Sequence, residues 1–315
     1  MQMVKPKALR AGDKICIVSP ASPIWTETYY DRGKRAIEGM GFEVTAGRYV
    51  QNRHLLFAGE AKKRADDINK AFQDKSIQAI FCNRGGTGTA HILPYIDFSI
   101  IKKNPKILVG YSDITTLQIA ILNETGLVTF YGPMVSTDFG KGISQYTMDN
   151  FLAVLTEKEK NLELRNPPDK EILTICKGRE EGPLTGGCLS IVAATLGTKH
   201  ELVAKDKILF FEDIDEKPHR VDRYLMQLIL AGKLQEAKGI IFGTFTRCRY
   251  LKRDAYEKYG VTLMDIIKDR ILPLNIPCIF GFQFGHVAKK LTIPMGAHAE
   301  LDATKGRVII GPAVR

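Results

Sequence analysis

The sequence lacks any long apolar run. The N-terminus, MQMVKPKALRAGDKICIVSP, begins with basic residues, but its apolar run at 15–18 is far too short for a signal peptide. No stretch approaches the ~20 apolar residues that span a bilayer. The sequence therefore predicts a cytoplasmic protein with no membrane partner.

Patterns of metal-binding and disulfide-bonded proteins are also missing. The cysteines are scattered, with no CxxC pair, and each lies in or beside an apolar or glycine-rich segment: Cys16, Cys82, Cys176, Cys188, Cys248 and Cys278. Reduced, buried thiols are expected from such positions. There is no HExxH or other metal-ligand spacing, so we expect neither a metal nor another cofactor.

Motifs of nucleic-acid recognition are absent, although the chain is basic. Its 45 Lys and Arg residues against 35 Asp and Glu residues give a net charge of +10. The longest basic runs are pairs such as Lys62-Lys63 and Lys289-Lys290, and no zinc-finger or RNA-binding pattern occurs. We therefore expect no nucleic-acid partner, and we assign the charge to attraction of small anionic substrates.

The length of 315 residues suits two α/β domains. In the first half, apolar strand-like runs alternate with stretches of helical periodicity, which predicts a mostly parallel sheet flanked by helices. The predicted strands are 13–19, 42–50, 77–82, 106–110 and 127–131, and the predicted helices are 26–41, 60–74 and 113–125. Ligands of such sheets bind at the carboxyl ends of the strands.

A polar stretch with Pro167-Pro168 and the charged KGREEG interrupts this pattern. It predicts an N-terminal domain at 1–156, a linker at 157–182 and a smaller C-terminal α/β domain at 183–315. In the last domain we expect helices at 188–196 and 219–231, strands at 207–211, 239–245, 278–282 and 290–294, and a β-hairpin in the tail at 298–310.

The glycine-rich loop 83–88, NRGGTG, directly follows the predicted strand 77–82. Glycines let a backbone turn sharply and point its N–H groups at a ligand. The loop is neither GxGxxG nor GxxxxGK[ST], so it has no nucleotide-binding fingerprint. An oxyanion hole and a plain tight turn both remain open.

Ser112 stands where the apolar strand 106–110 meets a helix. That position resembles a nucleophile elbow, which lifts a hydroxyl above the sheet beside the positive end of a helix. The sequence is not GxSxG, and serine and aspartate are also favoured helix caps. Capping and catalysis therefore both fit Ser112 and Asp113.

A carboxylate and a histidine that follow later strands complete a possible triad. Glu212 and Asp213 end the apolar run at 207–211, and His286 follows 278–282 in a glycine-bounded turn. A serine hydroxyl needs a base, and the base needs a carboxylate that fixes its tautomer. The alternatives are that a carboxylate caps the next helix and that the histidine is structural.

Several segments resemble the LD-carboxypeptidases, serine peptidases of murein recycling whose relatives include the microcin C self-immunity peptidases. The resemblance extends over nearly the whole chain, through GDKICIVSPASP, CNRGGTGTAHILPYID, ILVGYSDIT, TFYGPM, GPLTGGCLS, ILFFEDIDEKPHRVDRYL and FGHVAKKLTIPMGAHAELD. Its most distinctive parts are RGGTG, GYSD, FED and GH followed by PxG.

The resemblance implies two α/β domains, usually in a homodimer, and murein peptides as substrates. It places the nucleophile on Ser112, the acid on Glu212 and the base on His286. The amides of Gly86 and Asp113 would form the oxyanion hole, and no cofactor is implied. Arg84 and Gly85 are candidates for substrate binding, since an arginine suits a terminal carboxylate.

The sequence departs from this family at two points. Immunity-type relatives stack an adenine ring on tryptophans of a loop, whereas this chain has a single tryptophan, Trp25. Cys188 follows Gly186-Gly187 where asparagine is expected. Besides release of terminal D-alanine, two alternatives remain: a hydrolase of peptidyl-adenylate antibiotics and a non-catalytic α/β protein that binds a small ligand.

Overall fold

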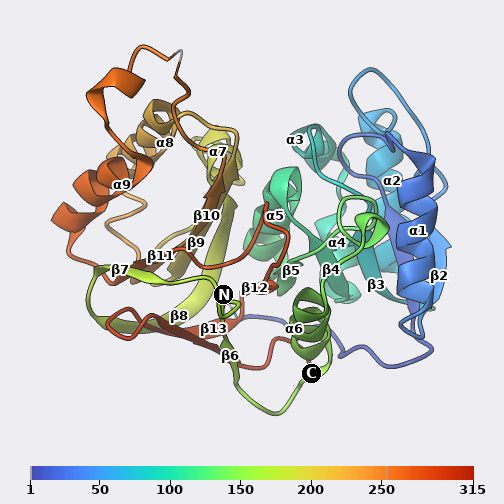
Figure 1. The fold of residues 1–315 in the computed structure, drawn as a ribbon. Coiled ribbons are helices and arrows are strands. Elements are labelled where there is room, and N and C mark those ends of the chain that lie inside the picture. The colour runs from blue at the N-terminus through green and yellow to red at the C-terminus, as the bar shows by residue number, and fades with distance from the viewer. Residues whose placement is uncertain (1, 253) are drawn as a thin grey trace.

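The chain folds around two β-sheets (Figure 1), in a computed structural model that describes residues 2–252 and 254–315. The helices are α1 Glu27–Glu38, α2 Ala61–Gln73, α3 Thr89–Ile92, α4 Phe98–Lys103, α5 Thr115–Thr125, α6 Gln145–Thr156, α7 Leu189–Ala194, α8 Pro218–Leu230 and α9 Leu263–Ile271. The 3-10 turns are η1 Leu93–Tyr95, η2 Ser112–Ile114, η3 Phe139–Lys141, η4 Glu257–Tyr259 and η5 Leu272–Leu274.

The first sheet has the strand order β12-β5-β4-β3-β1-β2. Its strands are β1 Lys14–Val18, β2 Glu43–Ala46, β3 Ile77–Cys82, β4 Ile107–Gly110, β5 Thr129–Tyr131 and β12 Ile293–Met295. The first five strands pair in parallel, and β12 joins β5 antiparallel, with Ile293 opposite Tyr131. The predicted, mostly parallel N-terminal sheet is confirmed.

The second sheet is mixed and has the order β6-β14-β13-β8-β9-β10-β11-β7. Its strands are β6 Leu162–Leu164, β7 Leu173–Cys176, β8 Arg179–Cys188, β9 Ile208–Ile214, β10 Gly239–Thr246, β11 Cys278–Phe280, β13 His298–Asp302 and β14 Arg307–Ile310. The strands β8 to β11 are parallel, and the flanking strands are antiparallel. The predicted tail hairpin corresponds to β13 and β14.

The stretch 157–182 contains regular structure that its polarity does not predict. It forms β6, β7 and the start of β8, which pair with β14, β11 and β13. Strands at a sheet edge expose alternate side chains, so such a segment resembles a loop in composition. Conversely, β12 lies in the first sheet, although the predicted strand at 290–294 was assigned to the second domain. The domain boundaries themselves stay a prediction.

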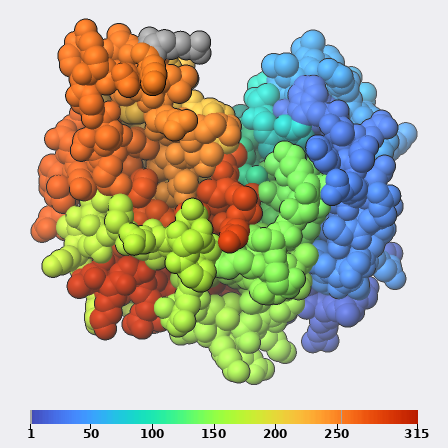
Figure 2. All heavy atoms as spheres, in the orientation of Figure 1, coloured from blue at the N-terminus to red at the C-terminus, as the bar shows by residue number. Residues whose placement is uncertain are grey.

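We call the first sheet with its flanking helices the first half of the molecule, and the second sheet with its flanking helices the second half. Helix α5 lies between these two halves (Figure 1). Most of its residues are buried, because it packs against its own sheet and also against β8 and α7. A groove separates the two halves at one end of the molecule (Figure 2). No helix in the described residues is long and apolar enough to cross a membrane.

Candidate active site

Ser112 occupies a strained turn at the carboxyl end of β4. Its φ is +67°, in the left-handed region that costs a residue with a side chain ~1–3 kcal/mol. The Oγ atom lies 3.0 Å from Nε2 of His286. The N-cap residue of η2 is Tyr111 and not Ser112, and the Ser112 hydroxyl is hydrogen-bonded to the His286 imidazole. The strain and this contact favour a nucleophile over a helix cap.

His286 and Glu212 are hydrogen-bonded where the backbone at Gly285 passes close to the Glu212 side chain. Nδ1 of His286 is 2.8 Å from Oε2 of Glu212, which also accepts a hydrogen bond of 3.0 Å from the His286 amide. A Cβ on Gly285 would lie 2.1 Å from Cδ of Glu212, so this position requires a glycine. The Glu212 side chain is fully buried and lies within β9, which continues to Ile214, beyond the end at 211 that the sequence predicted.

The segment that carries His286 crosses from one sheet to the other, since β11 belongs to the second and β12 to the first. Lys290 anchors it to the first half. The buried Nζ of Lys290 pairs with Asp138 and lies 3.1 Å from the Tyr111 hydroxyl. The Tyr111 ring in turn contacts the His286 imidazole edge to face, with ring centroids 5.0 Å apart. The sequence did not single out these anchoring residues.

Tyr131, at the end of β5, is a second residue that sequence reasoning missed. Its hydroxyl donates a hydrogen bond of 2.6 Å to Oε1 of Glu212 and accepts one of 3.2 Å from the Ser112 amide. Burial, followed by the charge of Glu212, raises the pKa of Tyr131 well above its usual value. The hydroxyl therefore stays protonated and remains a donor. Its only signal in the sequence was its place in TFYGPM.

The glycine-rich loop packs directly against Ser112. A Cβ on Gly85 would lie 2.8 Å from Cβ of Ser112, and a Cβ on Gly86, where φ is +112°, would lie 2.3 Å from Oγ of Ser22. The Asp113 carboxylate holds the end of this loop by accepting a 2.9 Å hydrogen bond from the Thr89 amide. In the described part of the chain, the Gly86 amide has no hydrogen-bond partner.

Arg84 and Trp25 lie together beside this loop. The Arg84 guanidinium is 5.5 Å from the centroid of the Trp25 ring, and Trp25 as a whole residue is 53% exposed. Arg53 approaches the same ring at 5.3 Å. Burial lowers the pKa of Arg84. The single tryptophan, which closely follows the segment GDKICIVSPASP in the sequence, thus lies beside the proposed substrate-binding Arg84.

Asp213 is buried beside Glu212 and accepts hydrogen bonds from the Ser190 amide, at 2.7 Å, and from the Ile214 amide, at 2.9 Å. It thereby caps α7 rather than the helix that follows it in sequence. The Cys188 thiol lies 3.4 Å from the same carboxylate. Burial and then the charge of Glu212 raise the pKa of Asp213 to about 6.

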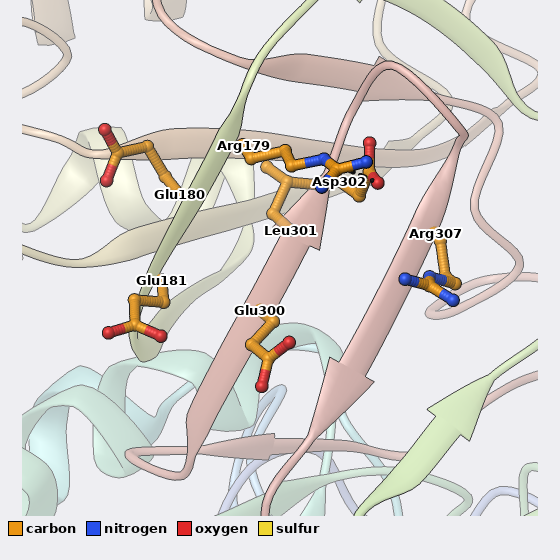
Figure 3. Close-up of a pocket in the computed structure, with 7 residues that line it drawn as sticks. All are labelled: Arg179, Glu180, Glu181, Glu300, Leu301, Asp302 and Arg307. Atoms are coloured by element: carbon orange, nitrogen blue, oxygen red, sulfur yellow. Dashed lines mark ion pairs between the residues drawn. The ribbon is translucent and has the colours of Figure 1, made fainter.

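A cavity of about 390 Å³ adjoins the imidazole, lined among others by Tyr111, Lys141, Arg247 and His286. A second hollow, of about 270 Å³, lies on β8, β13 and β14 (Figure 3) and is lined by charged side chains such as Glu181 and Arg307. The start of β8 is about 30 Å from its end near Ser112, at ~3.3 Å per residue. The second hollow therefore takes no part in this site.

The arrangement can perform nucleophilic catalysis. A hydroxyl on a strained turn contacts an imidazole, the imidazole contacts a buried carboxylate, and a glycine loop lies beside the hydroxyl. No group of three His, Cys, Asp or Glu side chains that could hold a metal occurs among the residues that the structure describes. The fold and this geometry are those of an α/β serine hydrolase.

Comparison with known proteins identifies the family to which the chain belongs. Residues 15–132 match the LD-carboxypeptidase N-terminal domain, and residues 181–301 match the LD-carboxypeptidase C-terminal domain. The chain belongs to the LD-carboxypeptidase family, which confirms the resemblance seen in the sequence and supports a serine carboxypeptidase activity.

Individual relatives cover almost the whole chain. A "Probable murein peptide carboxypeptidase" of Bacillus subtilis is 38% identical over 98% of this chain and 95% of its own length. The crystal structure of a muramoyltetrapeptide carboxypeptidase from Oxalobacter formigenes has a TM-score of 0.84 at 30% identity, covering 96% of this chain and all of that one. The microcin C7 self-immunity protein of Escherichia coli is 28% identical over 93% of this chain and 92% of its own length.

The buried Asp213 generates a pH prediction. Its pKa of about 6 in the folded chain exceeds the ordinary value of 3.8, so the folded state holds the proton more tightly. The resulting stabilisation, about 3 kcal/mol, is complete below about pH 4 and is lost as the pH rises through about 6. Asp213→Asn should remove this loss.

Urea unfolding at about pH 4 and about pH 7.5 measures the effect. We expect the fall in unfolding free energy between the two pH values to be smaller in Asp213→Asn than in the wild type. The exposed Asp149→Asn serves as the matched control. An equal fall in all three proteins would contradict the assignment.

Proposed function

We propose that this chain is a serine LD-carboxypeptidase that releases the terminal D-alanine of murein tetrapeptides. The observation that carries the proposal is the contact of 3.0 Å between Ser112 Oγ, on its strained turn, and His286 Nε2, which Glu212 orients. The 38% identity to the Bacillus subtilis protein supports murein peptides as the substrate class.

In this mechanism Ser112 attacks the carbonyl at the L-configured centre of the diamino acid. His286 takes the hydroxyl proton and returns it to the departing D-alanine amine, while Glu212 stabilises the charged imidazole. The amides of Gly86 and Asp113 hold the developing oxyanion, where loss of one donor typically costs ~100–1000-fold in rate. Water activated by His286 then frees the peptide from Ser112.

The proposed enzyme is a cytoplasmic homodimer, as the sequence and the family resemblance imply. Hydrolysis of acyl-adenylates, the activity of the self-immunity type, is the second candidate. Trp25, a half-exposed aromatic residue beside Arg84, favours testing it, since an accessible aromatic ring suits a nucleobase. We rank it second because the identity to the immunity protein is 28%, lower than the 38% to the murein peptidase.

The proposal predicts that the wild type releases D-alanine from L-Ala-γ-D-Glu-meso-diaminopimelyl-D-Ala. Ser112→Ala should lower this rate by roughly 10⁴-fold or more, because the nucleophile is lost. Mass-spectrometric detection of free D-alanine measures both proteins. Ser76→Ala, at an exposed serine, is the control and should match the wild type.

An acyl-sulfamoyl adenylate is assayed in parallel. Cleavage of that compound without D-alanine release would replace the proposal by the immunity-type activity. Binding of the tetrapeptide without turnover of either compound would favour the non-catalytic alternative.

Arg84 is proposed to bind the terminal carboxylate of the substrate, with the backbone of Gly85 beside it. Loss of a charge-assisted hydrogen bond is worth ~1.5–3 kcal/mol, so Arg84→Ala should raise KM by about 10- to 100-fold. Steady-state kinetics of Arg84→Ala and of Arg307→Ala, on the distant β14 strand, provide the comparison. An equal KM in both variants would show that Arg84 only braces the loop.

A further inference from the structure

Both backbone groups of Ser112 are held by hydroxyls. The Ser112 amide donates to the Tyr131 hydroxyl at 3.2 Å, and the Ser112 carbonyl accepts from the Thr115 hydroxyl at 2.6 Å. Both side chains are fully buried, so water does not compete for these hydrogen bonds. A left-handed conformation persists only where the surrounding structure fixes it, and these contacts fix it on both sides.

Each hydroxyl also contacts the second half of the molecule. The Tyr131 hydroxyl donates to Oε1 of Glu212 at 2.6 Å, and the Thr115 hydroxyl accepts from the Cys188 amide at 3.2 Å. Cys188, the last residue of β8, pairs with Glu212 of the neighbouring strand β9 in the second sheet. A hydroxyl can donate one hydrogen bond and accept others at once, and both are used in this way.

The fit at Thr115 depends on a glycine. A Cβ on Gly187, where φ is +129°, would lie 2.6 Å from both Oγ1 and Cγ2 of Thr115. Any side chain there would push β8 away from α5 and break the contact between the Cys188 amide and Thr115. The close approach of β8 to Thr115 therefore requires a glycine at position 187.

We propose that Tyr131 and Thr115 are positioning residues that hold Ser112 in its reactive conformation and connect it to Glu212 and Cys188 of the second half. Both side chains are fully buried and would act through Ser112 rather than on the substrate itself. Tyr131 additionally restrains Glu212 through its hydroxyl. The inference rests on the proposed role of Ser112 as the nucleophile and adds the residues that position it.

Removal of single hydroxyls tests this proposal. Tyr131→Phe keeps the ring and its edge contacts with Phe210 and Phe284, whose centroids lie 5.5 and 6.4 Å away, so the core should stay packed. Thr115→Val is close in shape to threonine. We expect kcat for D-alanine release to fall about 10- to 100-fold in each variant, with KM within about twofold of the wild type.

Matched controls lie outside the site. The buried Thr125 hydroxyl donates to the Ile121 carbonyl at 2.7 Å and accepts from the Leu127 amide at 3.2 Å, the same pattern as Thr115. The Tyr146 hydroxyl donates to the Arg165 carbonyl at 2.6 Å. Thr125→Val and Tyr146→Phe should keep the wild-type kcat, and Thr115→Ser should recover most of the kcat that Thr115→Val loses.

The proposal fails if both variants keep kcat within about twofold of the wild type, or if only KM changes. Should the wild type cleave neither the tetrapeptide nor the acyl-adenylate, the proposed function fails instead. Crystal structures of the Tyr131→Phe/Thr115→Val double variant then decide the positioning role. Ser112 should leave the left-handed region, and a φ unchanged near +67° would overturn the inference.

Discussion

The carboxylate of Glu212 lies where no water reaches it. An isolated charge in such a place costs several kcal/mol unless protein groups solvate it. The donors come from Tyr131 in the first sheet and from the amide and ring of His286, on the segment that crosses between the sheets. The hydrogen bonds that stabilise the buried Glu212 carboxylate are therefore complete only when the second half packs against the first.

The same constraint explains how a triad divided between two sheets keeps its geometry. Ser112 belongs to the first half and Glu212 to the second, and His286 bridges them on a segment fixed at both ends by strands of different sheets. The buried pair of Lys290 with Asp138 holds the middle of that segment against the first half. Preorganised contacts of this kind place reacting groups before a substrate arrives.

The sequence predicted the parts of the fold that follow apolar periodicity, such as β3, α8 and the tail hairpin. It failed for β6 and β7, because half-exposed edge strands resemble loops in composition, and for the sheet that contains β12, because pairing between distant segments leaves no local signal. Ser112, Glu212 and His286 were visible as polar residues after apolar strands. Tyr131 and Thr115 were not, since their hydrogen bonds to Glu212 and Cys188 join segments that are far apart in the sequence.

Rapid acid quenching during turnover, followed by mass spectrometry of the peptides, tests most directly whether Ser112 is the nucleophile. With saturating tetrapeptide, the account predicts an adduct on the peptide that contains Ser112, with the mass of the acyl tripeptide. The adduct should be absent from Ser112→Ala. An adduct on a different residue, or full turnover with no adduct at Ser112 on the millisecond timescale, would contradict the account.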